Sequence, residues 1–362
     1  MSRTRAWTLL ALTAFWPLAG SRPVELLAGA REPNLGSNPP ELGVVRWERD
    51  LDRGLAESRQ DRKPALILFQ EIPGCGTCVG FGRQVLSHPL LVEAIETEFV
   101  PIAIHNNRGG RDREVLARFS EPAWNNPVLR FVDGGGRDVV PRRDGLYSPH
   151  QVAKRLIEAL AAAGRPIPDY LELARDETHL AAFEPAAFGM HCYWQGEAKL
   201  GAIAGVVATR AVWREGGEAV EVMFDRDALS YRELVRKASA AGCAARVFTR
   251  DDDQHRTARA LVGERAVRGA GSGRSASGSD QKHSLERSPL RLLPLTPMQA
   301  TRVNAALALG TDPQRWLSPR QRGLVRTIER ALAADPNRLA GLARPETVED
   351  LAAYETRLRA RL

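Results

Sequence analysis

The chain contains few cysteines for its length, and several common functional patterns are absent. It has four cysteines in 362 residues, and two of them form a single Cys-x-x-Cys pair, Cys75 and Cys78. No second such pair and no matching histidine pair accompanies it, so the ligand set of a structural zinc site is incomplete. The sequence also lacks a glycine-rich phosphate loop. We therefore expect no metal, flavin or nucleotide cofactor.

Basic residues exceed acidic ones, but they are not concentrated in one stretch. The 51 lysines and arginines outweigh 44 acidic residues, for a net charge of +7. Proteins that bind nucleic-acid strands interleave basic residues with aromatic ones, and no block of that kind is present. We expect a solvated basic surface and no nucleic-acid partner.

A long hydrophobic run is missing everywhere except at the N-terminus. Residues 1–5 are basic, residues 6–20 are apolar, and small residues follow at 28–30, which is typical of a secretory signal over residues 1–30. The apolar run is short for a bilayer span. We expect export, to the periplasm or another extracytoplasmic compartment, with no stable membrane insertion. An uncleaved N-terminal anchor is the alternative, and residues 31–43 are predicted to be a linker.

The spacing of Cys75 and Cys78 indicates a chemically reactive pair and not a structural disulfide, because a disulfide across a two-residue gap closes too small a loop to stabilise a fold. The apolar run at 65–69 predicts a buried strand that leads to these cysteines at the start of a helix. Amide groups and the helix dipole would stabilise the Cys75 thiolate there. Cys78, one turn on, would resolve a mixed disulfide.

Residues 44–170 resemble the thioredoxin superfamily in the order of their predicted elements. The superfamily's usual Trp-Cys-Gly-Pro-Cys is replaced here by Pro-Gly-Cys-Gly-Thr-Cys. Asn126-Pro127 stands where the superfamily keeps a cis-proline facing the cysteine pair, which implies that role for Pro127. The predicted helices are 79–86, a stretch after Pro89, 111–119 and 149–163, and the predicted strands are 65–69, 99–105, 128–132 and 137–140.

A second cysteine-centred stretch, residues 186–250, contains His191-Cys192-Tyr193-Trp194, then Gly196-Glu197 and the run 218–222. In these residues it resembles the A-type peptide methionine sulfoxide reductases. The resemblance implies a ferredoxin-like α+β sandwich in which Cys192 is the nucleophile and Glu218 the proton donor. Tyr193, Trp194 and Trp213 would enclose the methyl group of the substrate. The predicted strands are 202–213, 218–224 and 244–248, with a helix at 231–241.

This stretch also departs from that family. His191 replaces a glycine, and Gln195 is an extra residue. The family's later Gln-Tyr-Arg segment has its nearest counterpart at residues 280–283, which lack the tyrosine. Cys243 follows a predicted helix by one glycine. It is either a resolving thiol near Cys192 or a small buried hydrophobic residue.

The remainder of the chain divides into two parts. Residues 263–284 are rich in glycine, serine and arginine without apolar periodicity, which predicts a disordered linker. Residues 285–362 are predicted to be a helical tail, with helices at 297–309, 319–334 and 345–362. With a signal and two cysteine-bearing domains, the length is that of a multidomain chain.

Together these patterns lead to one principal functional hypothesis. The chain is expected to be a peptide-methionine (S)-S-oxide reductase that acts on oxidised proteins or peptides through Cys192. The Cys75/Cys78 dithiol would reduce the resulting sulfenic acid and would itself be recharged by an unidentified electron donor. In the alternative, only Cys75 and Cys78 are active, as a thiol–disulfide oxidoreductase with a non-catalytic second domain. A third hypothesis is a scaffold whose helical tail binds a partner.

Overall fold

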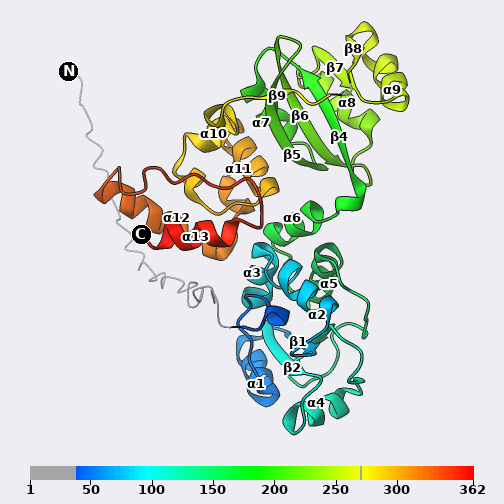
Figure 1. The fold of residues 1–362 in the computed structure, drawn as a ribbon, viewed down its shortest axis with the longest axis vertical. Helices are drawn as coiled ribbons and strands as arrows, with labels where there is room; N and C mark the ends of the chain where they lie inside the picture. The colour runs from blue at the N-terminus through cyan, green and yellow to red at the C-terminus, as the bar shows by residue number, and fades with distance from the viewer. Residues whose placement is uncertain (1–37, 270) are drawn as a thin grey trace, which may run out of the picture. The chain divides into compact units, whose positions relative to one another are not determined.

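The structure is a computed structural model that describes residues 38–269 and 271–362 (Figure 1). The predicted signal segment, residues 1–30, lies outside the described residues, as does most of the predicted linker at 31–43. Within the part of the chain that is described, no helix is both long and apolar enough to cross a membrane.

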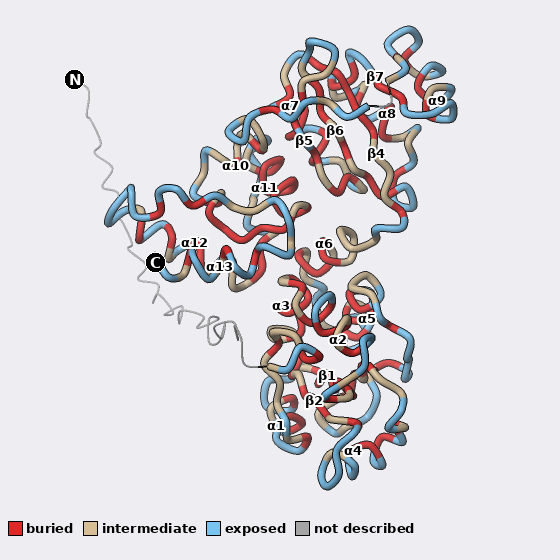
Figure 2. Tube along the Cα trace, viewed as in Figure 1, coloured by how far each residue is buried: buried red, intermediate tan, exposed pale blue. Residues whose placement is uncertain are grey.

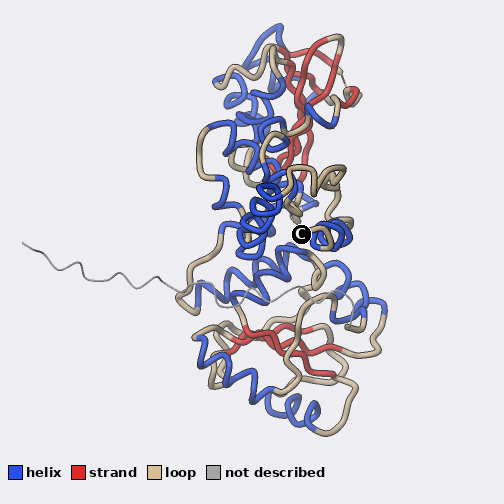
Figure 3. Tube along the Cα trace, turned by 90° about the vertical axis from the view of Figure 1, so that its left-hand side faces the viewer, coloured by secondary structure: helices blue, strands red, loops and turns tan. Residues whose placement is uncertain are grey.

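The N-terminal domain is built on a three-stranded sheet with the order β2-β1-β3. The central strand β1 (Ala65–Gln70) runs parallel to β2 (Val100–His105) and antiparallel to β3 (Val128–Val132). All six positions of β1 are buried. An unbroken apolar run suits a strand that is covered on both faces, and helices flank this sheet on either side in Figure 3.

Alternate residues of β1 belong to two different apolar clusters. On one face, Ile67 and Phe69 contact residues of α1 (Leu51–Asp61) and α4 (Arg111–Phe119). On the other, Leu66 and Leu68 share a cluster with three further helices. The strand labelled β1 has the red of buried residues in Figure 2. Those helices are α2 (Gly76–Gln84), α3 (Pro89–Glu98) and α5 (Pro149–Ala162). The strand predicted at 137–140 is reduced to an isolated bridge between Val132 and Asp138.

The second domain is a six-stranded sheet with the order β8-β7-β4-β6-β5-β9. Its four central strands have the order and the antiparallel pairing of a ferredoxin-like sandwich, as the resemblance implied. Helices α7 and α8 contribute to the main apolar cluster on this sheet. The elements are β4 (Phe183–Gly189), α7 (Tyr193–Gly201), β5 (Val206–Arg214), β6 (Gly217–Asp225), α8 (Tyr231–Ala240), β7 (Arg246–Thr249) and α9 (Asp252–Val262).

The prediction of a disordered linker at 263–284 is wrong for the residues that the structure describes. This segment adds β8 (Ala266–Arg268) beside β7 and β9 (Arg274–Ser275) beside β5. It then enters α10 (His283–Glu286). Lys282 Nζ lies 2.7 Å from the Glu197 carboxylate, whose side chain is completely buried. A long-range contact of this kind leaves no periodic signal in the sequence.

The C-terminal part is helical, with α11 (Pro297–Leu309), α12 (Pro319–Ala334) and α13 (Leu351–Arg359). Thr296 and Ser318 form capping boxes at the starts of α11 and α12, each followed by proline in the first turn. Helix α6 (Asp169–Glu177) precedes the second domain. Short 3₁₀ helices lie at Pro40–Leu42, Leu180–Ala182, Gly263–Arg265, Gly278–Asp280, Pro289–Leu292 and Pro313–Trp316.

Candidate functional site

Cys75 and Cys78 lie at the start of α2, where the buried strand β1 delivers them. Cys75 is the N-cap residue and is exposed, whereas Cys78 is fully buried. Their sulfurs are 3.6 Å apart, and both are free thiols. The Cys75 thiol is therefore accessible to a substrate, and the buried Cys78 thiol lies close enough to react with Cys75.

The environment moves the pKa values of the two thiols in opposite directions. The backbone N–H of Cys78 and then its side chain hydrogen-bond to Cys75 and lower the pKa of that thiol. Burial, followed by the neighbouring Cys75, raises the pKa of Cys78 to about 11. An exposed thiol of lowered pKa beside a buried one of raised pKa suits a nucleophile and its resolving partner.

Asn126, in the segment before β3, lies beside the cysteine pair. The Cys78 thiol donates to Asn126 Oδ1 at 2.6 Å, and the next peptide bond, Asn126–Pro127, is cis. The predicted cis-proline is thus confirmed. Sequence reasoning missed Asn126 as a partner of Cys78, although it directly precedes that proline.

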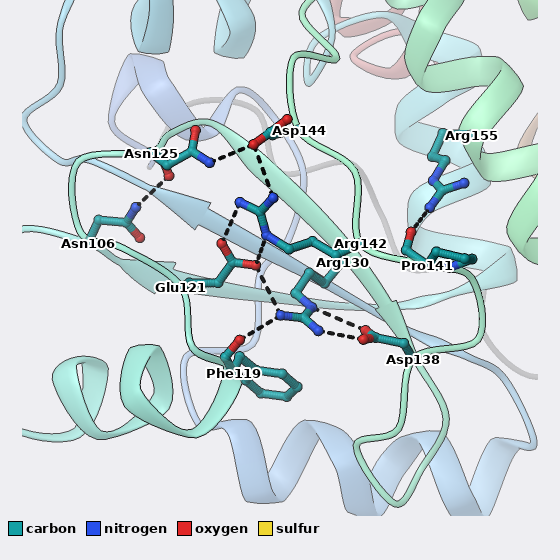
Figure 4. Close-up of polar contacts among 10 residues, drawn as sticks. All are labelled: Asn106, Phe119, Glu121, Asn125, Arg130, Asp138, Pro141, Arg142, Asp144 and Arg155. Carbon is teal, nitrogen blue, oxygen red and sulfur yellow. Dashed lines mark hydrogen bonds and ion pairs between the residues drawn. The ribbon is translucent and has the colours of Figure 1, made fainter.

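An ion-pair network centred on one buried glutamate holds the loop of Asn125, which precedes Asn126 (Figure 4). The fully buried carboxylate of Glu121 accepts from Arg130 at 3.0 Å and from Arg142 at 2.7 Å. Arg142 also bonds Asp144, whose carboxylate accepts from Asn125 Nδ2 at 2.9 Å. These contacts join residues that precede Pro127 in the sequence to residues that follow it, and so hold the turn at this proline in place.

In the second domain, Cys192 is the N-cap residue of α7 and is half-buried. Glu218, on β6, contacts the first residue of this helix, because its Oε2 accepts a hydrogen bond from the N–H of Tyr193 at 2.7 Å. Gly196 lies one turn later, where a Cβ would meet Met190 Sδ at 1.9 Å, so a larger residue would have to displace the Met190 side chain. The structure thus brings the predicted nucleophile and the predicted proton donor to the same helix end.

The aromatic residues predicted for this site also lie together. The Tyr193 ring makes edge contacts with Trp213 at 5.7 Å and Trp194 at 6.3 Å between centroids. Trp194 is partly exposed and stacks on His283 at 3.7 Å, and its Nε1 donates to Asp280 Oδ1 at 3.2 Å. Asp280 and His283 therefore contact the predicted site, and the weak match of residues 280–283 to the family's later segment was the one signal for them.

Neighbouring acids and burial also affect the titratable groups here. Burial, then a hydrogen bond with Asp280, raises the pKa of the Tyr193 hydroxyl. Burial lowers the pKa of His283, which favours its neutral form.

Cys243 is buried, with its sulfur 3.7 Å from Ala241 O. Burial raises the pKa of this thiol. Across the described residues, its sulfur makes no hydrogen-bond contact with Cys192. Its predicted role as a resolving thiol has no support from this arrangement, and the buried hydrophobic alternative fits its surroundings.

Comparisons with known proteins bear on the first of the two domains. Residues 46–134 match a family model described as Thioredoxin-like. Among solved structures, a chain titled "DsbH Oxidoreductase" is similar at 20% identity and a TM-score of 0.28, covering 37% of this chain and 96% of that one. The search of curated proteins gave no match. The chain thus carries a thioredoxin-like domain, and the likeness of the second domain to methionine sulfoxide reductases stays a prediction.

Proposed function

We propose that the thioredoxin-like domain is a thiol–disulfide oxidoreductase. The observation that carries this proposal is the exposed Cys75 thiol, of lowered pKa, 3.6 Å from the buried Cys78 thiol. The Cys75 thiolate attacks a substrate disulfide and forms a mixed disulfide as one substrate thiolate leaves. Cys78 then loses its proton and attacks Cys75, which releases the second substrate thiol and leaves a Cys75–Cys78 disulfide.

This proposal is tested by following the reduction of a protein disulfide with a chemical reductant as the electron source. We expect Cys75→Ser to reduce the rate to that of the reductant alone, because no other exposed thiol of lowered pKa is found among the described residues. Cys243→Ser is the matched control and should keep the wild-type rate. Equal rates for wild type and Cys75→Ser would contradict the proposal.

For the second domain we propose reduction of methionine-S-sulfoxide in proteins or peptides. The supporting observation is the hydrogen bond between Glu218 and the Tyr193 N–H, beside Cys192 and the aromatic residues. The Cys192 thiolate attacks the sulfoxide sulfur, and Glu218 gives a proton to the oxygen. The S–O bond of the substrate then breaks, and the hydroxyl passes to the Cys192 sulfur as the new bond between the two sulfurs breaks. Methionine leaves, and Cys192 becomes a sulfenic acid.

The two domains can then work in one cycle. A Cys75 thiol condenses with the Cys192 sulfenic acid, releasing water and forming a mixed disulfide. Attack by Cys78 restores the Cys192 thiol and leaves the Cys75–Cys78 disulfide for an external electron donor. A reductant on the same chain acts at a high effective concentration where the connection lets the sites meet.

A single-turnover assay with a methionine sulfoxide peptide separates these steps. Reduced wild type should form methionine, Cys192→Ser should form none, and Glu218→Gln should react about 100-fold more slowly, the usual effect of losing a general acid. Glu215→Gln, an exposed acid in the turn between β5 and β6, is the control. Methionine formation that persists in Cys192→Ser would exclude this mechanism.

A further inference from the structure

A third potential ligand lies beside the Cys75/Cys78 pair. The carboxylate of Glu71 and the two sulfurs all lie within 4.8 Å of one another. Glu71 comes from the loop between β1 and α2 and is half-buried. Across the described residues its carboxylate has no hydrogen bond or ion pair with the protein. It is therefore a free oxygen donor next to a dithiol.

The spacing of the sulfurs suits a tetrahedral cation. They are 3.6 Å apart. Two thiolates bound to zinc at about 2.3 Å each, in tetrahedral geometry, lie about 3.8 Å from one another. Two thiolates and a carboxylate fill three of four positions, the number of protein ligands in an open zinc site. Thiolate ligands favour zinc and related soft cations over magnesium or calcium.

The loop that bears these ligands is held in place from several directions. A Cβ at Gly74 would meet Glu71 O at 2.4 Å and Cys78 Cβ at 2.6 Å, so only glycine allows this close turn. Gly74 N donates to Glu41 Oε1 at 2.8 Å, and Ile72 N donates to Asn107 Oδ1 at 3.2 Å. The ligands are thus brought together before any cation arrives, which reduces the entropic cost of binding one.

We propose that the reduced protein binds one zinc-class divalent cation through Cys75 Sγ, Cys78 Sγ and the Glu71 carboxylate, with water in the fourth position. Each sulfur that is protonated beforehand releases its proton to solvent as the S–metal bond forms, and no atom changes oxidation state. Once the Cys78 proton has left, the Asn126 amide can turn its NH₂ toward the new thiolate as an outer hydrogen-bond donor.

This site and disulfide exchange exclude one another, because both use the same two sulfurs. A cation on the pair blocks attack by Cys75 on a substrate. A Cys75–Cys78 disulfide in turn leaves Glu71 as the single ligand. The binding itself does not depend on the proposed oxidoreductase activity, so either proposal can fail alone.

The test uses the full chain with Cys192→Ser and Cys243→Ser, so that Cys75 and Cys78 are the only thiols. Reduced, metal-free protein is titrated anaerobically with Co²⁺, which reports sulfur ligands by a thiolate-to-cobalt charge-transfer band. Zn²⁺ affinity is then measured by competition with a chromophoric chelator. We expect one ion per chain, no charge-transfer band in Cys75→Ser, and no comparable binding after oxidation to the disulfide.

Glu71→Gln decides whether the carboxylate is a ligand. Its loss should weaken Zn²⁺ affinity by at least about 10-fold, the smallest effect usually seen even when a group that only supports a ligand is removed. Glu114→Gln, an exposed acid on α4, is the matched control and should bind as the parent does. Affinity unchanged by Glu71→Gln would overturn the three-ligand site. No binding by the reduced parent, or equal binding by the disulfide form, would overturn it as well.

Discussion

The two cysteines at the start of α2 differ in exposure and in thiol pKa although their sulfurs lie only 3.6 Å apart. Cys75 is exposed and receives the Cys78 backbone N–H, which lowers the pKa of its thiol. Cys78 is buried, and its thiol donates to Asn126 Oδ1. Burial, followed by the neighbouring Cys75, raises the pKa of Cys78 and so keeps the proton on the resolving thiol until Cys75 has reacted.

Alkylation by iodoacetamide measures this difference directly. At pH 7 Cys75 should react at least about 100-fold faster than Cys78, since the pKa of Cys78 is raised to about 11 and an ordinary thiol titrates near 8.5. The pH profile for Cys75 should have its midpoint below that of free cysteine, because a lowered pKa leaves more thiolate at a given pH. Peptide mass spectrometry provides the readout.

Unfolding supplies the control for that measurement. In denaturant both cysteines lose their environments and should react at similar rates. Equal rates in the folded protein would contradict the assignment of Cys75 as the nucleophile.

Some of the residues at both sites could be predicted from the sequence and others could not. Cys192 and Glu218 followed from a family pattern, and the hydrogen bond from Tyr193 N to Glu218 agrees with it. The Glu71 carboxylate was not predicted, because its place beside the sulfurs depends on the turn at Gly74. The spacing of residues in the sequence indicates which of them lie on the same helix or strand. The conformation of a loop decides which of its side chains come close to that helix or strand.

At the level of elements, the segment that contains β9 and α10 is anchored by one buried lysine. Lys282 Nζ and its backbone N–H both donate to the Glu197 carboxylate, each at 2.7 Å, and Nζ also donates to Thr209 O. The adjacent Gln281 side chain bonds the backbone of Ala211 through both of its polar groups. These contacts bring Asp280 and His283 to the Cys192 site.

Lys282→Met should destabilise the protein by about 3–5 kcal/mol. It leaves the Glu197 carboxylate buried without its cation, and that is the usual cost of breaking a buried pair from one side. The free energy of unfolding is measured by urea denaturation. Lys237→Met removes an exposed lysine from a surface pair on α8 and should change stability by less than about 1 kcal/mol. Similar effects from both variants would show that the Glu197 pair does not anchor the segment.

Glycine and serine content led to the prediction of disorder at 263–284, and the reason for the error is physical. Composition reports how little apolar surface a segment can bury. It does not report a buried ion pair between residues that are 85 positions apart in the sequence, such as Lys282 and Glu197. The strands β1 and β6 were predictable because their apolar runs are local.

At the scale of the whole molecule, the C-terminal helices contact the thioredoxin-like domain through buried charges. Arg320 at the start of α12 donates its backbone N–H to Glu93 on α3 at 3.0 Å, and its guanidinium pairs with both Glu93 and Glu96. Arg46 also bonds Glu96, at 2.8 Å from its backbone N. Two acids thus share Arg320 in a site with little access to water.

Arg320→Met should destabilise the protein, and more so at high pH. Burial raises the pKa of Glu93 to about 7 even though Arg320 lowers it. A folded-state pKa above the ordinary value means that this carboxyl favours folding below pH 4.5 and that the advantage is lost as pH rises through 7. Without Arg320 the ionised form becomes still less favourable. The loss of unfolding free energy should therefore be smaller at pH 5 and reach about 3 kcal/mol at pH 8.

Urea denaturation of wild type and Arg320→Met at both pH values gives this comparison. Arg326→Met, which removes an exposed arginine from the same helix, controls for the change in net charge and should show little dependence on pH. If Arg320→Met costs the same at pH 5 and pH 8, Glu93 does not titrate in this range and the contact holds the tail by packing alone. A larger cost at pH 8 would mean that the charge on Glu93, and hence Arg320, controls how firmly the helical tail is attached to the domain that carries Cys75 and Cys78.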